Sequence, residues 1–222
     1  MYRLIIKIIN NFLKKFKFFR LINYKLKKKY YINFENLNLE QNSIVLDFGA
    51  NIGVVSQYLL DKYNCKIECF EPNKLLFKKL EKIFKYEKNV NCHNCGVAEN
   101  NGSQKLYFHK NYNLDKINFS KGSSFIKEKN NIDINNYEYV ETRSITDILN
   151  LYKKIDLIKI DIEGSEYNIL PEIIKNKNKI KKVICELHGN NKKNKNFDEQ
   201  YNNFIKLLNK TDPERKWFLK HH

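Results

Sequence analysis

The sequence predicts an α/β protein in which a mostly parallel sheet carries helices on both faces. Short, β-branched apolar segments alternate along the chain with longer amphipathic segments, as expected for strands joined by crossover helices. The composition, 42% apolar and 14% aromatic, is sufficient for a packed core. Because 222 residues are enough for one such domain and short for two, we expect one domain over 41–222 behind a short helical arm over 1–40.

Five short apolar segments bounded by turn residues read as buried strands: 43–47, 66–70, 90–95, 156–160 and 183–187. Helical spacing of apolar residues predicts helices over 54–63 and 75–84, the second with Leu76, Leu80, Ile83 and Phe84 on one face, and a last helix over 197–208. Residues 105–145 break this rhythm with short strand-like pieces. We expect them to form an insertion over the binding edge of the sheet, which lies at the carboxyl ends of parallel strands.

The net charge of +16 is concentrated at the ends of the chain. Residues 1–30 hold ten Lys/Arg and no acid, whereas 31–170 hold 18 basic and 19 acidic side chains. A nucleic-acid groove would normally run through the catalytic surface, so nucleic acid is not the expected partner. The arm combines helical apolar periodicity with basic residues, so it either packs on its own domain or a second copy, giving a homo-oligomer, or lies on a membrane surface.

No apolar run reaches the roughly 18 residues of a spanning helix, and charged and amide residues interrupt the region where a signal peptide would lie. Five cysteines are an odd number at modest density, so reduced thiols are expected. Cys92 and Cys95 lie in a predicted strand, where positions i and i+3 face opposite sides, so zinc is not expected there. These features predict a cytoplasmic protein, peripheral at the membrane if the arm binds lipid.

The segment from Asp47 to Gly53 follows the first strand and opens the first helix. Its glycines allow a tight turn and a close approach of a nucleotide. An acid at the strand end suits a cationic or amino-bearing ligand better than a pyrophosphate, which favours S-adenosylmethionine over a dinucleotide. The predicted cofactor loop therefore comprises Asp47, Gly49, Ala50, Asn51 and Gly53.

Glu71 ends the second strand and is followed by Pro72, which can start the next helix. A carboxylate at this point can accept hydrogen bonds from both ribose hydroxyls of an adenosine. An ordinary turn acid beside a helix N-terminus is the alternative. Cys95 and Gly96, at the end of the third strand, are expected to border the adenine.

At these positions the sequence resembles the FkbM-type S-adenosylmethionine-dependent methyltransferases. The resemblance rests on VLDFGANIG (45–53), FEPN (70–73), GSS (122–124) and above all KIDIEGSE (159–166). It implies a class I methyltransferase fold, which is Rossmann-like, and an enzyme that methylates hydroxyls of sugars, glycans or related small molecules.

A second group of acids follows the fourth and fifth predicted strands. Asp161 and Glu163 come after one strand, and Glu186 and His188 after its neighbour, so they are expected to meet at one edge of the sheet. We predict Asp161, Glu163 and His188 as catalytic, with His188 as a general base of ordinary pKa and Asp161 orienting the acceptor beside the cofactor. Alternatively, Asp161 and Glu186 bind a divalent cation, or His188 is only a satisfied loop histidine.

Two other functions stay open at this point. An RNA or protein methyltransferase would agree with the basic charge, but the fourth strand is followed by Asp161-Ile162-Glu163-Gly164 and not by the Asn/Asp-Pro-Pro-Tyr-like clamp of amino methylation. The second alternative is a non-catalytic protein that binds S-adenosylmethionine or serves as a membrane adaptor.

Overall fold

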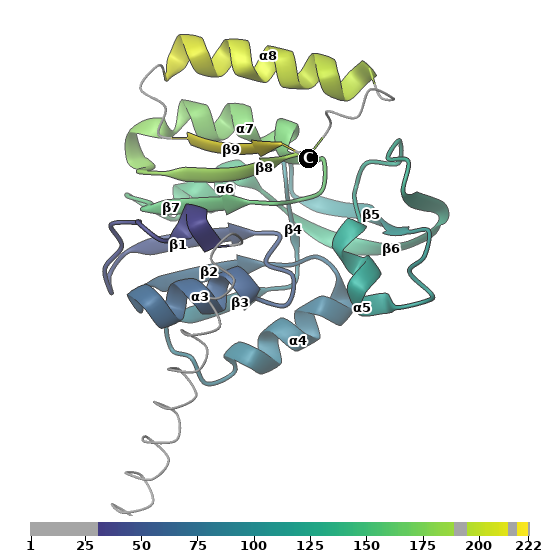
Figure 1. The fold of residues 1–222 in the computed structure, drawn as a ribbon, viewed down its shortest axis with the longest axis horizontal. Coiled ribbons are helices and arrows are strands. Elements are labelled where there is room, and N and C mark those ends of the chain that lie inside the picture. Colours follow the sequence, from purple (N-terminus) through teal and green to yellow (C-terminus); the bar gives the residue numbers. More distant parts are fainter. Residues whose placement is uncertain (1–30, 189–194, 213–216, 222) are drawn as a thin grey trace, which may run out of the picture.

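The centre of the molecule is a six-stranded sheet in the order β3-β2-β1-β7-β8-β9, with every neighbouring pair parallel (Figure 1). The computed structural model describes residues 31–188, 195–212 and 217–221. Its strands are β1 (Ile44–Phe48), β2 (Lys66–Phe70), β3 (Val90–His93), β7 (Leu157–Ile160), β8 (Val183–Leu187) and β9 (Trp217–His221). The order reverses direction between β1 and β7, and in open parallel sheets a ligand crevice lies beyond the carboxyl ends at such a point.

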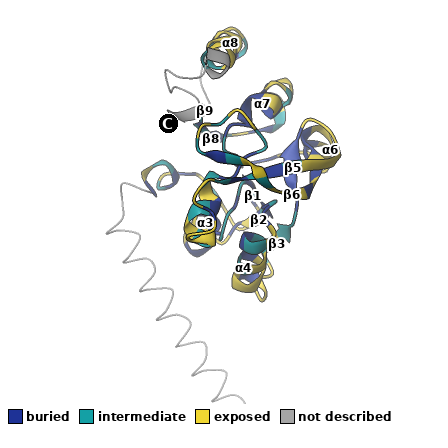
Figure 2. Cartoon of the chain, turned by 90° about the vertical axis from the view of Figure 1, so that its right-hand side faces the viewer, coloured by how far each residue is buried: buried dark blue, intermediate teal, exposed yellow. Residues whose placement is uncertain are grey.

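Helices cover both faces of this sheet, as the sequence predicts (Figure 2). The helices α3 (Val54–Tyr63) and α4 (Lys74–Phe84) pack on one face, and α6 (Ile145–Asn150), α7 (Glu166–Lys175) and α8 (Lys195–Thr211) contribute to the core on the other. Alternation along β1 explains the two cores, because Val45 faces the first set of helices and Leu46 the second. All three predicted helices are confirmed within two or three residues.

The predicted insertion over 105–145 belongs to a separate sheet that begins earlier in the chain, at Gly96. Its strands are β4 (Gly96–Ala98), β5 (Gly102–His109) and β6 (Ile132–Ser144), in the order β4-β6-β5, and the short helix α5 (Lys116–Phe119) lies between β5 and β6. Three 3₁₀ turns complete the described elements: η1 (Ile32–Phe34), η2 (Ser120–Gly122) and η3 (Lys177–Lys179). The second sheet stands over the carboxyl edge of the first, so the chain between 96 and 144 closes the site from above.

The structure corrects three details of the sequence prediction. Residues 90–95 do not form one strand, because β3 ends at His93 and the chain then enters the second sheet as β4. Ile83 is 47% exposed, while the other apolar residues named on that helix are buried. The strand β9 was not predicted, because its apolar part is only the three residues Trp217, Phe218 and Leu219 before Lys220 and His221.

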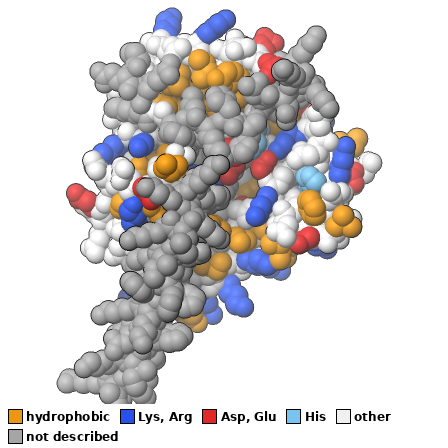
Figure 3. All heavy atoms as spheres, viewed as in Figure 1, with side chains coloured by type: hydrophobic (Ala, Val, Ile, Leu, Met, Phe, Trp, Pro, Cys, Tyr) orange, Lys and Arg blue, Asp and Glu red, His pale blue; other side chains and the backbone are white. Residues whose placement is uncertain are grey.

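The predicted basic arm falls mostly on residues 1–30, outside the described part of the chain. Its last residues pack on the domain: Tyr31 stacks on Tyr58 of α3 with ring centroids 4.5 Å apart, and the Tyr63 hydroxyl donates to the carbonyl of Phe34 at 2.7 Å. Among the described helices none is both long enough and apolar enough to cross a membrane. On the face seen in Figure 3, basic, acidic and apolar side chains of the described residues are interspersed.

A buried ion pair joins β1 to β7 below the carboxyl edge. The Nζ atom of Lys159 lies 3.0 Å from Oδ1 of Asp47, and the two side chains are 8% and 0% exposed. The same Nζ donates to the carbonyl of Gly49 at 2.7 Å, so the lysine also fixes the loop that follows β1. The Ser56 hydroxyl of α3 donates to the other carboxylate oxygen of Asp47 at 2.5 Å.

We predict that Lys159→Met lowers the free energy of unfolding by about 3–5 kcal/mol, because it leaves the Asp47 carboxylate buried without its cation. The double variant Lys159→Met/Asp47→Asn should recover part of this loss. Urea denaturation followed by circular dichroism measures both. The matched control is Lys175→Met, whose pair with Glu172 at 3.0 Å is solvent-exposed and should cost less than about 1 kcal/mol. Equal losses in the two lysine variants would contradict the prediction.

Candidate functional site

A cavity of about 460 Å³ lies where the carboxyl ends of β1, β2 and β7 face the second sheet. Nine of the residues predicted from the sequence line it: Gly49, Ala50, Asn51, Glu71, Pro72, Gly96, Asp161, Glu163 and Glu186. Four others do not line it: Asp47, Gly53, Cys95 and His188. The volume falls within the usual range of small-molecule sites, roughly 300–1,000 Å³.

The loop after β1 turns over the end of β2. The amides of Gly49 and Ala50 both donate to the carbonyl of Phe70 at 3.0 Å. Gly49 has φ +77°, and a Cβ there would lie 1.9 Å from the carbonyl oxygen of Asp161, so only glycine fits between the two strand ends. Gly53 has a packing role: with φ +82°, it leaves room for the Phe84 ring of α4, which a Cβ would meet at 2.5 Å.

Glu71 lines the cavity, and two backbone amides hold its carboxylate. Asn51 N–H donates to Oε2 at 2.8 Å and Asn73 N–H to Oε1 at 2.9 Å. Burial raises the pKa of Glu71 to about 7, although these two hydrogen bonds and the charge of Lys159 act in the opposite direction. Each oxygen keeps accepting capacity toward the cavity, as ribose binding would require.

The prediction that Asp47 faces the ligand is not supported by its position. Its carboxylate is fully buried between Lys159 and Ser56 and does not line the cavity. Sequence reasoning missed Lys159, which does line the cavity and also lies 3.9 Å from Oδ2 of Asp161. A lysine inside the otherwise apolar strand 157–160 was the available signal, because a cation in a buried strand requires a partner.

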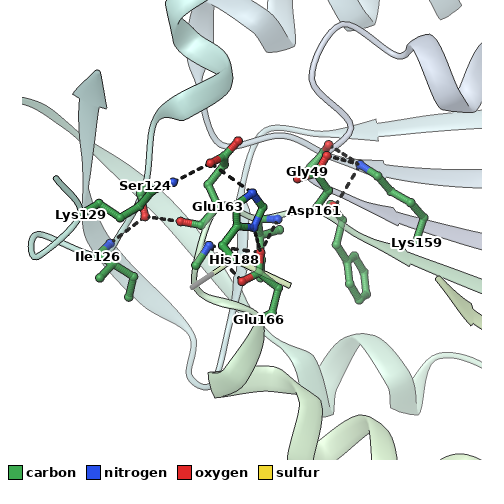
Figure 4. Close-up of polar contacts among 12 residues, drawn as sticks. Gly49, Ser124, Ile126, Lys129, Lys159, Asp161, Glu163, Glu166 and His188 are labelled. Atoms are coloured by element: carbon green, nitrogen blue, oxygen red, sulfur yellow. Dashed lines mark hydrogen bonds and ion pairs between the residues drawn. The ribbon is translucent and has the colours of Figure 1, made fainter. Parts of the chain in front are cut away.

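A row of alternating charges borders the cavity beside Asp161 (Figure 4). Glu166, at the start of α7, is fully buried and lies 3.1 Å from Nδ1 of His188. Its carboxylate also accepts from the amides of Ile162 and Gly164, which shapes the turn after β7. On the other side of the imidazole, Nε2 lies 3.5 Å from Oε2 of Glu163.

This arrangement overturns the expectation of an ordinary pKa for His188. Burial lowers the pKa, but the hydrogen bond and charge of Glu166 and the charge of Glu163 outweigh it and raise the pKa to about 9. At neutral pH the imidazole is therefore protonated and cannot accept a proton. Burial also raises the pKa of Glu163, against the lowering effect of Lys129 and His188.

The segment 120–131, which we call the roof segment, lies between α5 and β6 and ties the second sheet to this row. The Ser124 hydroxyl donates to the carbonyl of Glu163 at 2.7 Å, and Nζ of Lys129 lies 2.5 Å from Oε2 of Glu163. Ser123 lines the cavity, and its buried hydroxyl has no hydrogen-bond partner among the described residues. The GSS sequence signalled the two serines, but nothing local indicated that Lys129 reaches Glu163.

The sequence suggests a divalent cation at Asp161 and Glu186, and the structure shows which ligand atoms lie near these two residues. Asp161, Glu186 and His188 each place a donor atom within 4.8 Å of the others. Both ring nitrogens of His188 already face carboxylates, so a cation would have to displace a proton from the imidazole. Asp161 and Glu186 alone provide too few ligands for a hard divalent ion, and the cation stays a sequence prediction.

The FkbM methyltransferase domain matches residues 47–213 of this chain. The chain belongs to this family. Two curated relatives match at 27% identity: Methyltransferase 1 of Beauveria bassiana (strain ARSEF 2860), over 58% of this chain and 57% of the relative, and methyltransferase sdnD of Sordaria araneosa, over 60% and 61%. The chain thus spans about three-fifths of the length of these curated relatives.

Among solved structures, the precorrin-6y C5,15-methyltransferase from Geobacter metallireducens GS-15 aligns with 79% of this chain and 66% of its own, at 13% identity and a TM-score of 0.41. Family membership implies S-adenosylmethionine as cofactor and agrees with the Rossmann-like order of the central sheet.

We predict that the stabilising effect of His188 disappears at alkaline pH. Its pKa is about 9 in the folded protein and roughly 6.5 when unfolded, so its contribution is complete below pH 6.5 and is lost as the pH rises through 9. The difference in unfolding free energy between the parent and His188→Gln should therefore shrink by about 3 kcal/mol between pH 6.5 and 10. Denaturation curves at several pH values measure it. A difference that stays constant would contradict a protonated His188.

Proposed function

We propose that this chain transfers the methyl group of S-adenosylmethionine to a hydroxyl group of a sugar, a glycan or a related small molecule. The observation that carries the proposal is one cavity that joins the glycine loop and Glu71 to the acids that follow β7 and β8. Strand ends on both sides of the reversal in strand order contribute to it, as expected for a nucleoside site with an adjoining acceptor site.

The charge of the cavity fits this cofactor. Four acidic residues line it, and they outnumber its two lysines: Glu71, Asp161, Glu163 and Glu186 against Lys121 and Lys159. Lys159 is already paired with Asp47, so the wall favours a cationic ligand. S-adenosylmethionine supplies a sulfonium-bound, electrophilic methyl group. Glu71 would hold the ribose, while the backbone of 49–51 would lie along the cofactor.

The acids beside His188 would act on the acceptor hydroxyl. A hydroxyl is a weak nucleophile at neutral pH, so it must be held in line and lose its proton as the new bond forms. Asp161 would orient the hydroxyl, because it ends β7 at the cavity wall. Glu163 would take the proton, since its carboxylate lines the cavity and its pKa is raised by burial. The cations Lys129 and His188 would then hold Glu163 in position.

Two features support a hydroxyl acceptor over an amine. The turn after β7 carries carboxylates, which suit proton removal from a hydroxyl. The roof segment adds the unpartnered Ser123 hydroxyl to a cavity wall, and buried polar groups normally have a hydrogen-bond partner. A polyhydroxylated acceptor offers several such partners.

We predict that the affinity for S-adenosylhomocysteine falls as the pH is lowered through about 7, the pKa of Glu71. The ionised carboxylate accepts from ribose hydroxyls with both oxygens, whereas protonation turns one oxygen into a donor and removes the negative charge that strengthens these bonds. Isothermal titration calorimetry at pH 6 and 8 should show about tenfold weaker binding at pH 6. In Glu71→Gln binding should be weaker at pH 8, by roughly ten- to a hundredfold, and should no longer change with pH. A parent-like pH dependence in Glu71→Gln would contradict the assignment.

We predict that Glu163→Gln reduces methyl transfer by about 10²–10⁴-fold, while S-adenosylhomocysteine still binds within a few fold of the parent. Radiolabelled S-adenosylmethionine is incubated with glycan, small-molecule, RNA and protein fractions of cells, and the labelled product is identified by mass spectrometry. Glu172→Gln, on the surface of α7, is the control and should keep full activity. Label in RNA or protein, or binding without any transfer, would overturn the proposed function.

A further inference from the structure

Two cysteines lie side by side on neighbouring strands at the edge of the described central sheet. Cys69 of β2 and Cys92 of β3 are Cα partners in the parallel register, so their side chains leave the same face. Neighbouring strands lie about 4.8 Å apart, and disulfides usually join Cα atoms that are 4.4–6.8 Å apart. The pair can therefore be joined with a small movement of β3, which has only four residues and one neighbour in this sheet.

The two thiols differ in access and in acidity. Cys92 is half-buried and Cys69 is fully buried. The hydrogen bond from Cys69 lowers the pKa of the Cys92 thiol, although burial and the carboxylates of Glu81 and Glu68 oppose it. The pKa of Cys69 is correspondingly raised, first by the same hydrogen bond and then by burial.

The remaining cysteines provide an internal contrast. Cys65, Cys95 and Cys185 are buried, and burial raises the pKa of each thiol. Reactive thiols have lowered pKa values and solvent access, and redox-sensitive ones often have a second cysteine beside them. Cys92 alone among the five cysteines combines these properties.

We propose that Cys69 and Cys92 form a site of reversible oxidation by hydrogen peroxide. The Cys92 thiolate attacks one peroxide oxygen, the O–O bond breaks, and the products are a sulfenic acid on Cys92 and hydroxide, which takes up the proton that Cys92 had released. The Cys69 sulfur then attacks the Cys92 sulfur, and the sulfenic hydroxyl leaves with the Cys69 proton as water. One peroxide is reduced to two waters and the two thiols are oxidised to one disulfide.

Oxidation at this site reaches the cofactor loop through one residue. The Cys69 sulfur lies 3.1 Å from the Ser56 hydroxyl, and that hydroxyl donates to Asp47. Forming the disulfide draws Cys69 toward β3 and away from Ser56. Ser56 and Asp47 then lose a fixed neighbour directly below the loop 49–53.

The first test is peptide mapping of the reduced full-length chain after treatment with one equivalent of hydrogen peroxide. The expected product is a Cys69–Cys92 disulfide that dithiothreitol reverses. In Cys69→Ser, the sulfenic acid on Cys92 should persist and be captured by dimedone, and in Cys92→Ser, Cys69 should stay reduced. Under native conditions iodoacetamide should label Cys92 about tenfold faster than Cys65, Cys95 or Cys185.

The second test compares S-adenosylhomocysteine binding of the oxidised and reduced protein. Oxidation should weaken binding by about fivefold, the value of one ordinary hydrogen bond, and Cys92→Ser should show no change on peroxide treatment. The proposed site would be overturned if Cys65, Cys95 or Cys185 were oxidised before Cys92, or if only intermolecular disulfides formed. If the protein with a demonstrated Cys69–Cys92 disulfide bound S-adenosylhomocysteine as tightly as the reduced protein, the proposed effect through Ser56 would be wrong. Peptide mapping needs no cofactor, so its result tests the disulfide independently of the proposed methyltransferase function.

Discussion

The contact between Lys159 and Asp47 is the constraint on which the rest of the site depends. One buried ammonium joins the ends of β1 and β7, the carbonyl of Gly49 and, at longer range, Asp161. A buried pair of this kind is weak evidence for stability, since desolvation offsets much of the attraction. Its consequence is positional: the glycine loop and the first acid after β7 cannot move independently. Lys159 therefore fixes the position of the glycine loop relative to Asp161.

A second chain of charges works in the same way on the acceptor side. Glu166, His188, Glu163 and Lys129 alternate in sign, and they come from α7, the end of β8, the turn after β7 and the roof segment. The carboxylate of Glu163, which lines the cavity, is thus held between two cationic groups that come from different parts of the fold. Glu163 also adopts φ +57°, a costly conformation for a residue with a side chain, and its cationic partners hold it there.

The local features of the sequence were sufficient to locate five of the six strands of the central sheet. Segments such as 66–70 and 183–187 were located to the residue, because buried parallel strands are short and apolar on both faces. The cavity positions of Glu71 and Asp161 followed from their place after strands. Long-range contacts could not be predicted: Lys129 meets Glu163 across 34 residues, and only the fold shows that Asp47 is turned inward. The pKa of His188 likewise depends on Glu166 and Glu163, and a position after a strand does not show which way such side chains point.

The division between the two sheets has a consequence for how such a protein can change its substrate. The central sheet supplies the glycine loop, Glu71 and Asp161, all of which are fixed by backbone contacts between strand ends. The roof segment contributes Ser123, Ser124 and Lys129 from a loop between two strands of the second sheet. Loops carried on a rigid scaffold tolerate sequence change better than strand ends do. Substitutions in 120–131 can therefore reshape the acceptor wall without disturbing Lys159, provided that Lys129 or an equivalent cation still balances Glu163.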